Sequence, residues 1–243
     1  MDSAERAERA EPRARAPGRT GMWRGRSPAQ RSATRRQQLL EAGLGVFGTI
    51  GWRQSTVRGI CVAAGLSERY FYESFPSRDE LLLAVYEDLN EREFEMFSLA
   101  TRDLLDGVAS PDDETLMGVL HEVLHAWFGT FADDPRVARV RLTEILGVSP
   151  EIDERYRAHN RRIADLIREV SGRSEHVDEA DAIVATITTG LVGALTIIAT
   201  DWYLSGFMLP LKYVVAAGET IFRGVLVESS GLAHPAGRTD ELR

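Results

Sequence analysis

The chain has 243 residues, 44% of them hydrophobic, and a formal net charge of −8. A chain of this length can bury a sizeable core, and it suggests one or two domains. Its single cysteine, Cys61, excludes an internal disulfide and a zinc site made of several cysteines. Residues 1–31 contain no apolar signal segment, which predicts a cytoplasmic protein.

The charge is unevenly distributed along the chain. Residues 1–36 hold ten arginines and four acidic residues, so this segment is basic and the remainder is acidic. Prolines and glycines recur through residues 1–30, which predicts a disordered, arginine-rich arm. A basic arm on an acidic body fits contact with nucleic acid, but a solvated tail without a function has the same composition. The sequence leaves both interpretations open.

Three short helices are predicted in a first domain spanning residues 31–76. They cover 32–49, 56–64 and 67–74. Ser55 or Thr56 caps the second helix, Ser67 caps the third, and Gly65 supplies the backbone freedom for the tight turn between them. Two short helices joined in this way form a helix-turn-helix, which places its second helix in the major groove of DNA.

Six further helices are predicted in a second domain spanning residues 77–229. They cover 77–105, 112–131, 134–147, 150–171, 177–205 and 210–229. Ser77 and Glu80 form a capping box at the start of the first, and a capping residue followed by proline begins three others (Ser110-Pro111, Asp134-Pro135 and Ser149-Pro150). No segment alternates as a strand does, so we predict an all-α fold: a three-helix head on a six-helix body, with a disordered tail at 230–243.

One apolar segment raises the possibility of a membrane-spanning helix. Ala182–Thr200 carries no charge over nineteen residues, close to the ~20 that span a bilayer. Its five threonines and its apolar residues at helical spacing favour a helix buried in protein, and we predict no membrane contact.

His121-Glu122-Val123-Leu124-His125 has the spacing of two zinc ligands and a general base on one helix, with Glu144 as a conceivable third ligand. A zinc-dependent hydrolase is therefore an alternative function. The motif fixes only three positions, and the all-α prediction offers no edge strand for a peptide substrate. We expect no catalytic residues, no bound metal and no cofactor.

A set of residues between 39 and 82 follows one recognisable order and spacing: Leu39-Leu40, Phe47, Gly51, Thr56-Val57, Ile60, Ala64-Gly65-Leu66-Ser67, Tyr72, Phe75-Pro76-Ser77-Arg78 and Leu81-Leu82. In these residues the chain resembles the TetR family of bacterial transcriptional regulators. The resemblance implies a homodimeric, ligand-responsive regulator, more often a repressor than an activator, that binds double-stranded DNA at a palindromic operator. A DNA-binding module without regulation is the other alternative.

The resemblance also assigns DNA contacts by position. They fall on Ser67, Glu68, Arg69 and Tyr70 for bases, Tyr72 for a phosphate, Thr56 at the cap of the second helix, Arg58 for a base, and Arg78 where a phosphate-binding lysine is usual. Arg69 and Tyr70 depart from the family's usual small residues, which alters the expected base preference but not the docking.

The predicted body would hold the effector site and the dimer interface. Aromatic residues and one histidine are candidates to line a site for a small, apolar effector (Phe94, Phe97, His121, Trp127, Phe131 and Trp202), with His125 and Asp201 as further polar contacts. The dimer seam is predicted on the last two helices (Val184, Ile187, Leu191, Leu195, Ile198, Tyr213, Val214, Ala217, Ile221 and Val225). An effector bound in the body would shift helix 77–105 and change the spacing of the two heads.

Overall fold

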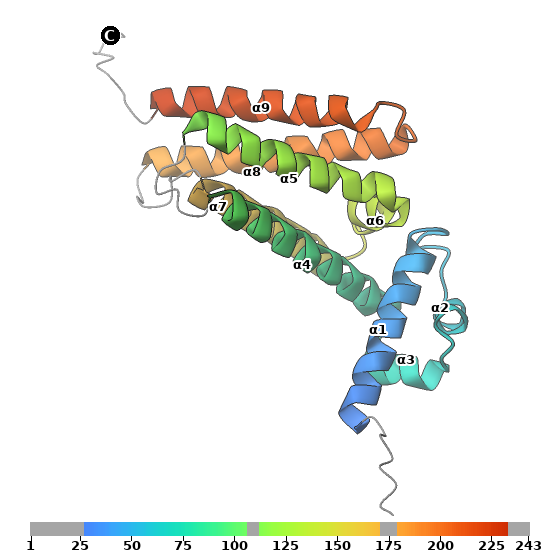
Figure 1. Cartoon of the computed structure of the whole chain (residues 1–243). Helices are drawn as coiled ribbons and strands as arrows, with labels where there is room; N and C mark the ends of the chain where they lie inside the picture. Colours follow the sequence, from blue (N-terminus) through green and yellow to red (C-terminus); the bar gives the residue numbers. More distant parts are fainter. Residues whose placement is uncertain (1–26, 106–111, 171–178, 233–243) are drawn as a thin grey trace, which may run out of the picture.

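The computed structural model describes residues 27–105, 112–170 and 179–232. All regular elements in these ranges are helical, as predicted. The head consists of α1 (Pro28–Phe47), α2 (Val57–Ala64) and α3 (Glu68–Ser74). The body consists of α4 (Arg78–Leu105), α5 (Asp113–Asp133), α6 (Pro135–Arg139), the π-helical turn η1 (Val140–Glu144), α7 (Pro150–Val170), α8 (Glu179–Leu204) and α9 (Leu211–Leu232). Figure 1 shows α4 running from the head into the body, where α5, α8 and α9 lie side by side.

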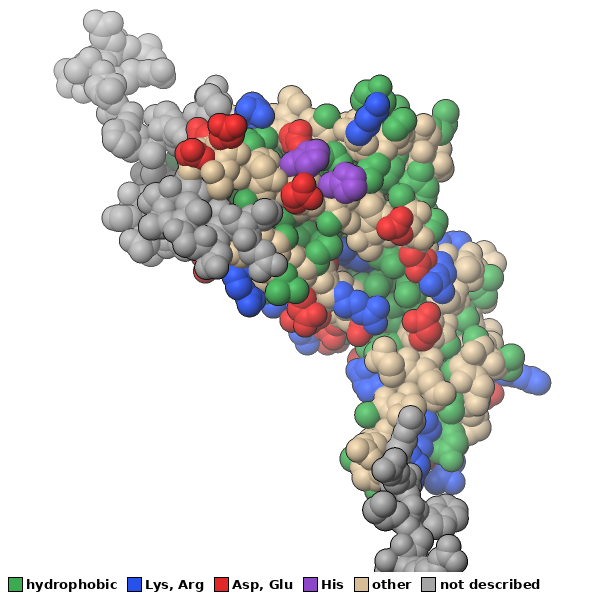
Figure 2. Space-filling view, viewed as in Figure 1, with side chains coloured by type: hydrophobic (Ala, Val, Ile, Leu, Met, Phe, Trp, Pro, Cys, Tyr) green, Lys and Arg blue, Asp and Glu red, His purple; other side chains and the backbone are tan. Residues whose placement is uncertain are grey.

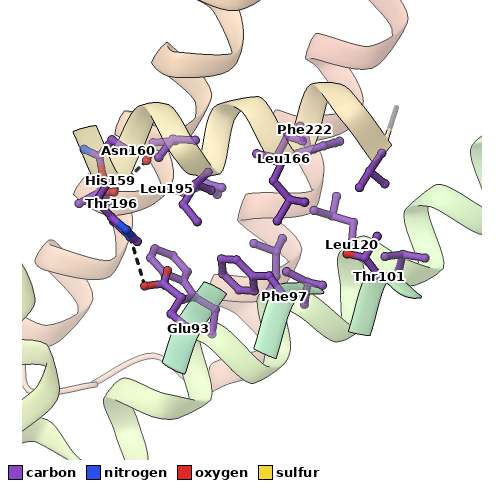
Figure 3. A pocket seen from close by; sticks show the side chains of 18 of the residues that line it. Glu93, Phe97, Thr101, Leu120, His159, Asn160, Leu166, Leu195, Thr196 and Phe222 are labelled. Atoms are coloured by element: carbon purple, nitrogen blue, oxygen red, sulfur yellow. Dashed lines mark hydrogen bonds and ion pairs between the residues drawn. The ribbon is translucent and has the colours of Figure 1, made fainter. Parts of the chain in front are cut away.

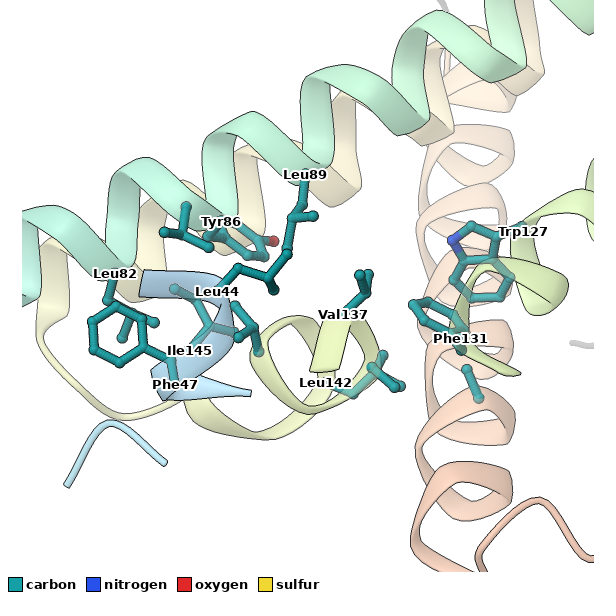
Figure 4. Close-up of a cluster of buried hydrophobic side chains, with 14 of the residues drawn as sticks. Leu44, Phe47, Leu82, Tyr86, Leu89, Trp127, Phe131, Val137, Leu142 and Ile145 are labelled. Carbon is teal, nitrogen blue, oxygen red and sulfur yellow. The ribbon is translucent and has the colours of Figure 1, made fainter. Parts of the chain in front are cut away.

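One hydrophobic core joins the head to the body. Leu39, Ile60 and Phe71 are fully buried between α1, α2 and α3. Phe47, near the end of α1, lies beside Leu82 of α4 in the close-up of this core (Figure 4). The same cluster continues to the aromatic residues of α5, so packed side chains connect the head with the body.

Local capping sets the helix-turn-helix. Thr56 caps α2, and its hydroxyl accepts a hydrogen bond from the Gly59 amide at 3.0 Å. Gly65 ends α2 with φ of 65°, the left-handed conformation that favours glycine. Ser67 occupies the cap position of α3 but makes no side-chain capping bond there, which leaves its hydroxyl available.

Several predicted boundaries were wrong. The predicted arm reached residue 30, yet α1 begins at Pro28, because proline is well suited to the first helical position and Ser27 and Gln30 form a capping box. The tail was predicted from residue 230, yet α9 continues to Leu232. Asp112 caps α5, and its carboxylate accepts a hydrogen bond from the Thr115 amide at 2.8 Å. The predicted cap Ser110, the predicted start of helix 177–205 and most of the predicted arm and tail lie outside the described residues.

The predicted helix 134–147 is also interrupted. A short α6 is followed by the π-helical turn η1, in which Val140, Arg141 and Leu142 are all buried. Successive residues of a helix point in different directions, so their burial shows that neighbouring elements surround η1 on more than one side: it contacts α1, α4 and α8. The wider turn also shifts the direction of the side chains that follow it.

Candidate DNA-binding head and effector pocket

The outer side of α3 is open to solvent. Phe71 is fully buried, while Tyr70 and Tyr72 are 38% and 58% exposed. Glu68 and Arg69 are exposed too, so the residues predicted to face bases lie together on one accessible surface. This surface has the shape and the hydrogen-bonding groups that a major-groove helix needs.

Contacts from α1 orient two side chains of α3. The guanidinium of Arg35 lies 4.4 Å from the centre of the Tyr70 ring. Glu73 accepts a hydrogen bond from Arg69 at 3.0 Å and lies 3.7 Å from Arg35. Such contacts reduce the rotamer freedom that Tyr70 and Arg69 would lose on binding DNA.

The basic charge of the head is local. Residues 31–76 contain six arginines against three glutamates, although the whole chain is acidic. Figure 2 shows Lys and Arg side chains around the head and many acidic side chains on the visible face of the body. Arg58, on the first turn of α2, is exposed. This distribution favours an approach to DNA with the head first.

Arg78 contacts the loop that precedes α2. Its Nη1 donates to the carbonyl oxygen of Trp52 at 3.0 Å, and it also contacts the carbonyl and hydroxyl oxygens of Ser55. The guanidinium lies 5.3 Å from the centre of the Trp52 ring. These contacts hold the loop that precedes α2, which gives Arg78 a structural role in addition to the phosphate contact that the resemblance implies.

Trp52 connects the head to two elements of the body. Its indole N–H donates to Asp79 of α4 at 3.0 Å, and its backbone N–H donates to Glu144 of η1 at 2.8 Å. Arg139 binds the same Glu144 at 2.8 Å and also donates to the carbonyl oxygen of Thr49. Gly51, with φ of 88°, leaves no room for a side chain beside Arg139 and Glu144.

A pocket lies in the body between α4, α5, η1, α7, α8 and α9. Its volume is about 120 Å³, several times the space that one water needs. Figure 3 shows Phe97, Leu166, Leu195 and Phe222 along the apolar part, with Glu93, His159, Asn160 and Thr196 grouped at one end. An apolar cavity with a few convergent polar groups is the usual form of a small-molecule site.

The polar end contains a buried ion pair. Arg141 contacts Glu93, and the Nε2 atom of His159 lies 3.5 Å from both partners. Burial favours the protonated form of Glu93, but the charge of Arg141 and the neighbouring His159 outweigh it and hold the pKa of this carboxyl below its usual value. Burial also raises the pKa of Tyr86, whose ring lies 6.1 Å from that of His159.

The predicted effector residues divide into two groups. Phe97 and Trp127 line the pocket, whereas Phe94, Phe131, Trp202 and His121 do not. Phe94 stacks against Arg162, Phe131 is core, and the Trp202 indole N–H donates to the Leu209 carbonyl oxygen across the turn between α8 and α9. His125 and Asp201 are exposed. The polar lining residues Glu93, Arg141 and His159 were missed.

A signal for two of the missed residues exists in the sequence. Glu93 follows Tyr86 and Leu89 and precedes Phe97 on the apolar stripe of α4, and His159 precedes Ile163 on that of α7. A charged or titratable residue at such a position is buried and needs a partner. Arg141 had no such signal, because it lies in the π-helical turn rather than on the apolar stripe of a regular helix.

The histidine motif lies on the surface. His121 and His125 are exposed on α5, with ring centres 6.2 Å apart, and the His121 Nδ1 atom lies 2.6 Å from a carboxylate oxygen of Glu219 on α9. Glu144, the conceivable third ligand, binds Arg139 and Trp52 instead. Within the described residues, no group of three or more possible metal ligands gathers.

The predicted dimer seam combines inward-facing and outward-facing residues. Leu191, Leu195 and Val214 are buried inside the subunit and cannot form a seam. The outward apolar residues of α8, α9 and their connecting turn are Ile183, Ile197, Leu204, Met208, Leu209, Tyr213 and Ile221. Val184, Ile187 and Ile198 are half-buried, Ala217 is exposed, and the side chain of Val225 lies outside the description. By length and composition alone, Ala182–Leu204 could also cross a membrane, and 28% of that window is buried inside the subunit. Within one subunit this helix is therefore less buried than predicted.

Comparisons with known proteins agree with this architecture. Residues 39–85 match the family model described as bacterial regulatory proteins, tetR family. No curated relative matches the chain. Among solved structures, the fatty acid degradation regulator FadR from Bacillus halodurans is 17% identical, with a TM-score of 0.62 over 78% of this chain and 95% of that one. FadR from Bacillus subtilis, in complex with stearoyl-CoA, is 17% identical, with a TM-score of 0.58 over 78% of this chain and 96% of that one. A TetR-like transcriptional regulator from Rhodococcus sp. RHA1 is 22% identical, with a TM-score of 0.57 over 80% of this chain and 97% of that one.

Proposed function

We propose that this chain, whose DNA-binding head and overall fold are those of the TetR family of bacterial transcriptional regulators, is a cytoplasmic, ligand-responsive repressor. It binds a palindromic operator as a homodimer and is released from DNA by a small, largely apolar effector. The observation that carries the proposal is the connection of two sites: an accessible α3 on the head and an apolar pocket in the body, joined by α4 and η1.

The exposed face of α8 and α9 supports the homodimer. Ile197 and Leu204 are each 68% exposed, and Tyr213 is 56% exposed. A monomer rarely leaves such a contiguous apolar surface in water. A second copy related by a two-fold axis would cover it with the same residues and would present two copies of α3 to two half-sites.

Two paths connect the pocket with the head. On α4, Glu93 lines the pocket, and Asp79, about 21 Å away along the helix, binds Trp52. On η1, Arg141 lines the pocket and Glu144 binds the same Trp52. An effector that shifts Glu93 and Arg141 as it enters the pocket would move both elements at Trp52 and turn the head. For the effector to release the protein from DNA, it must bind the conformation with the turned head more tightly than the DNA-binding conformation.

Selection of preferred oligonucleotides from a random pool tests this function. The full chain should enrich an inverted repeat, and a fluorescently labelled copy of that repeat should bind as a two-to-one complex. Enrichment of no sequence would contradict an operator-specific repressor and would favour a DNA-binding module without regulation.

A further inference from the structure

The polar end of the pocket carries equal and opposite formal charges from Glu93 and Arg141. Their side chains are only 6% and 8% exposed, and that of His159 is 8% exposed. Since the pKa of Glu93 is held below its usual value, the carboxylate is ionised at neutral pH. Together, Glu93 and Arg141 have no net charge to offer a ligand.

Buried donors remain unpartnered beside this cluster. Arg141 Nε and Trp127 Nε1 have no hydrogen-bond acceptor among the described residues. Glu93 Oε2 lacks a hydrogen bond of normal geometry as well, but it contacts both Arg141 and His159 as an ion pair. Trp127 lies near enough to Glu93 to lower the pKa of the carboxyl, without the geometry of a hydrogen bond. Asn90 Oδ1 is unpartnered too, but Asn90 does not line the pocket. Outside the ion pair, the unpartnered atoms of the lining are therefore two N–H donors, and they favour a ligand with an acceptor oxygen.

The same cluster also indicates the charge of the ligand's polar group. A ligand carboxylate would lie beside Glu93, and a ligand ammonium would lie beside Arg141. Either like-charge contact is costly in a buried site, where water screens little. An uncharged carbonyl or hydroxyl oxygen accepts from the free donors without that cost.

The shape of the remaining pocket indicates the body of the ligand. Phe97, Leu120, Leu195 and Phe222 line it beyond the polar end. Glu93 and Thr101 both line the pocket from α4, and eight residues of helix separate them by about 12 Å. The pocket is thus long enough for an extended aliphatic chain.

We propose that the effector is an uncharged amphipathic molecule: an elongated apolar body with one neutral carbonyl or hydroxyl group, held at the Glu93–Arg141–Trp127 end. The inference rests on the proposed function, since it names the ligand class of the same pocket. It excludes organic cations and carboxylates as preferred ligands, because Arg141 and Glu93 cancel each other's charge.

Calorimetric titration of the full chain at pH 7 tests the inference with three probes of one chain length: octan-2-one, octanoate and octylamine. We expect the ketone to bind at least about tenfold tighter than either ion. Glu93→Gln leaves Arg141 uncompensated and should raise octanoate affinity about tenfold or more. Arg141→Gln should do the same for octylamine. The double variant Glu93→Gln/Arg141→Gln has no charge at this end and should prefer the ketone again.

Either ion binding the unmodified chain as tightly as the ketone would overturn the inference, and so would no binding by any probe. Single variants that fold but leave the ranking unchanged would overturn it too. If the single variants do not fold, the order of the three probe affinities in the unmodified chain and in the double variant still tests the inference. Failure of the proposed function gives a different result, because the random pool would then yield no preferred sequence whichever probe binds.

Discussion

The backbone N–H of Trp52 donates to the carboxylate of Glu144 at 2.8 Å, across 92 residues of sequence. Trp52 lies in the loop before α2, and Glu144 ends η1, three residues after Arg141 in the pocket. A single short turn of the body thus reaches both the proposed effector site and the loop that positions the helix-turn-helix.

Replacement of Glu144 by alanine should weaken this connection. It leaves the Trp52 N–H and the Arg139 guanidinium without their shared acceptor, so the free energy of unfolding should fall by about 1–3 kcal/mol. The effector should also release the operator less completely. Chemical denaturation and a DNA-release titration measure the two effects. Glu95→Ala, at an exposed position of α4, is the control and should change stability by less than about 0.5 kcal/mol. Equal effects of the two substitutions would contradict the role of Glu144.

Arg58 and Arg78 should differ in how they affect DNA binding. Arg58 is exposed and is expected to contact a base, so Arg58→Ala should weaken operator binding by about 1–3 kcal/mol, relax the sequence preference and leave the melting temperature unchanged. Arg78 holds the Trp52–Ser55 loop, so Arg78→Ala should lower the melting temperature and weaken binding to every sequence. A reduced salt slope for Arg78→Ala at full thermal stability would instead place Arg78 at a phosphate.

The proposed dimer should depend on Ile197. A carboxylate at this position of α8 would be buried against the second copy without a partner, so Ile197→Asp should convert the dimer to a monomer at micromolar concentration. Sedimentation velocity measures the change. Leu99→Asp, at a 50% exposed position of α4, should leave the dimer intact. A dimer that persists in Ile197→Asp would move the interface away from the α8–α9 face.

Acid should destabilise the body partly through Glu93. Because its folded pKa lies below the ordinary value of 4.5, its ionisation stabilises the fold above pH 4.5, and this contribution is lost as pH falls through the folded pKa. The free energy of unfolding should therefore decline more steeply below about pH 4.5 in the unmodified chain than in Glu93→Gln/Arg141→Gln. Identical pH profiles would show that folding does not lower the pKa of Glu93.

The helix-turn-helix was predictable because its signals are local. Thr56 caps α2, Gly65 takes the left-handed conformation, and Phe71 faces inward between exposed neighbours. Each of these depends on a few adjacent residues. The all-α architecture followed in the same way from helical spacing.

Pairings between distant residues could not be predicted. Arg78 binds a loop 23 to 26 residues earlier, and Glu93 of α4 meets Arg141 of η1. Periodicity shows which face of a helix is apolar, but it does not show which neighbour covers that face. The same limit led the predicted dimer seam to include the buried residues Leu191 and Val214.

The sequence by itself determined a helical protein with a DNA-reading head, because capping, turns and helical spacing act over one or two turns of chain. Only the tertiary structure decided where the pocket lies, that its charges cancel, and that Trp52 joins α4 and η1. These features arise where side chains from separate elements exclude water together, and such packing is a property of the whole fold.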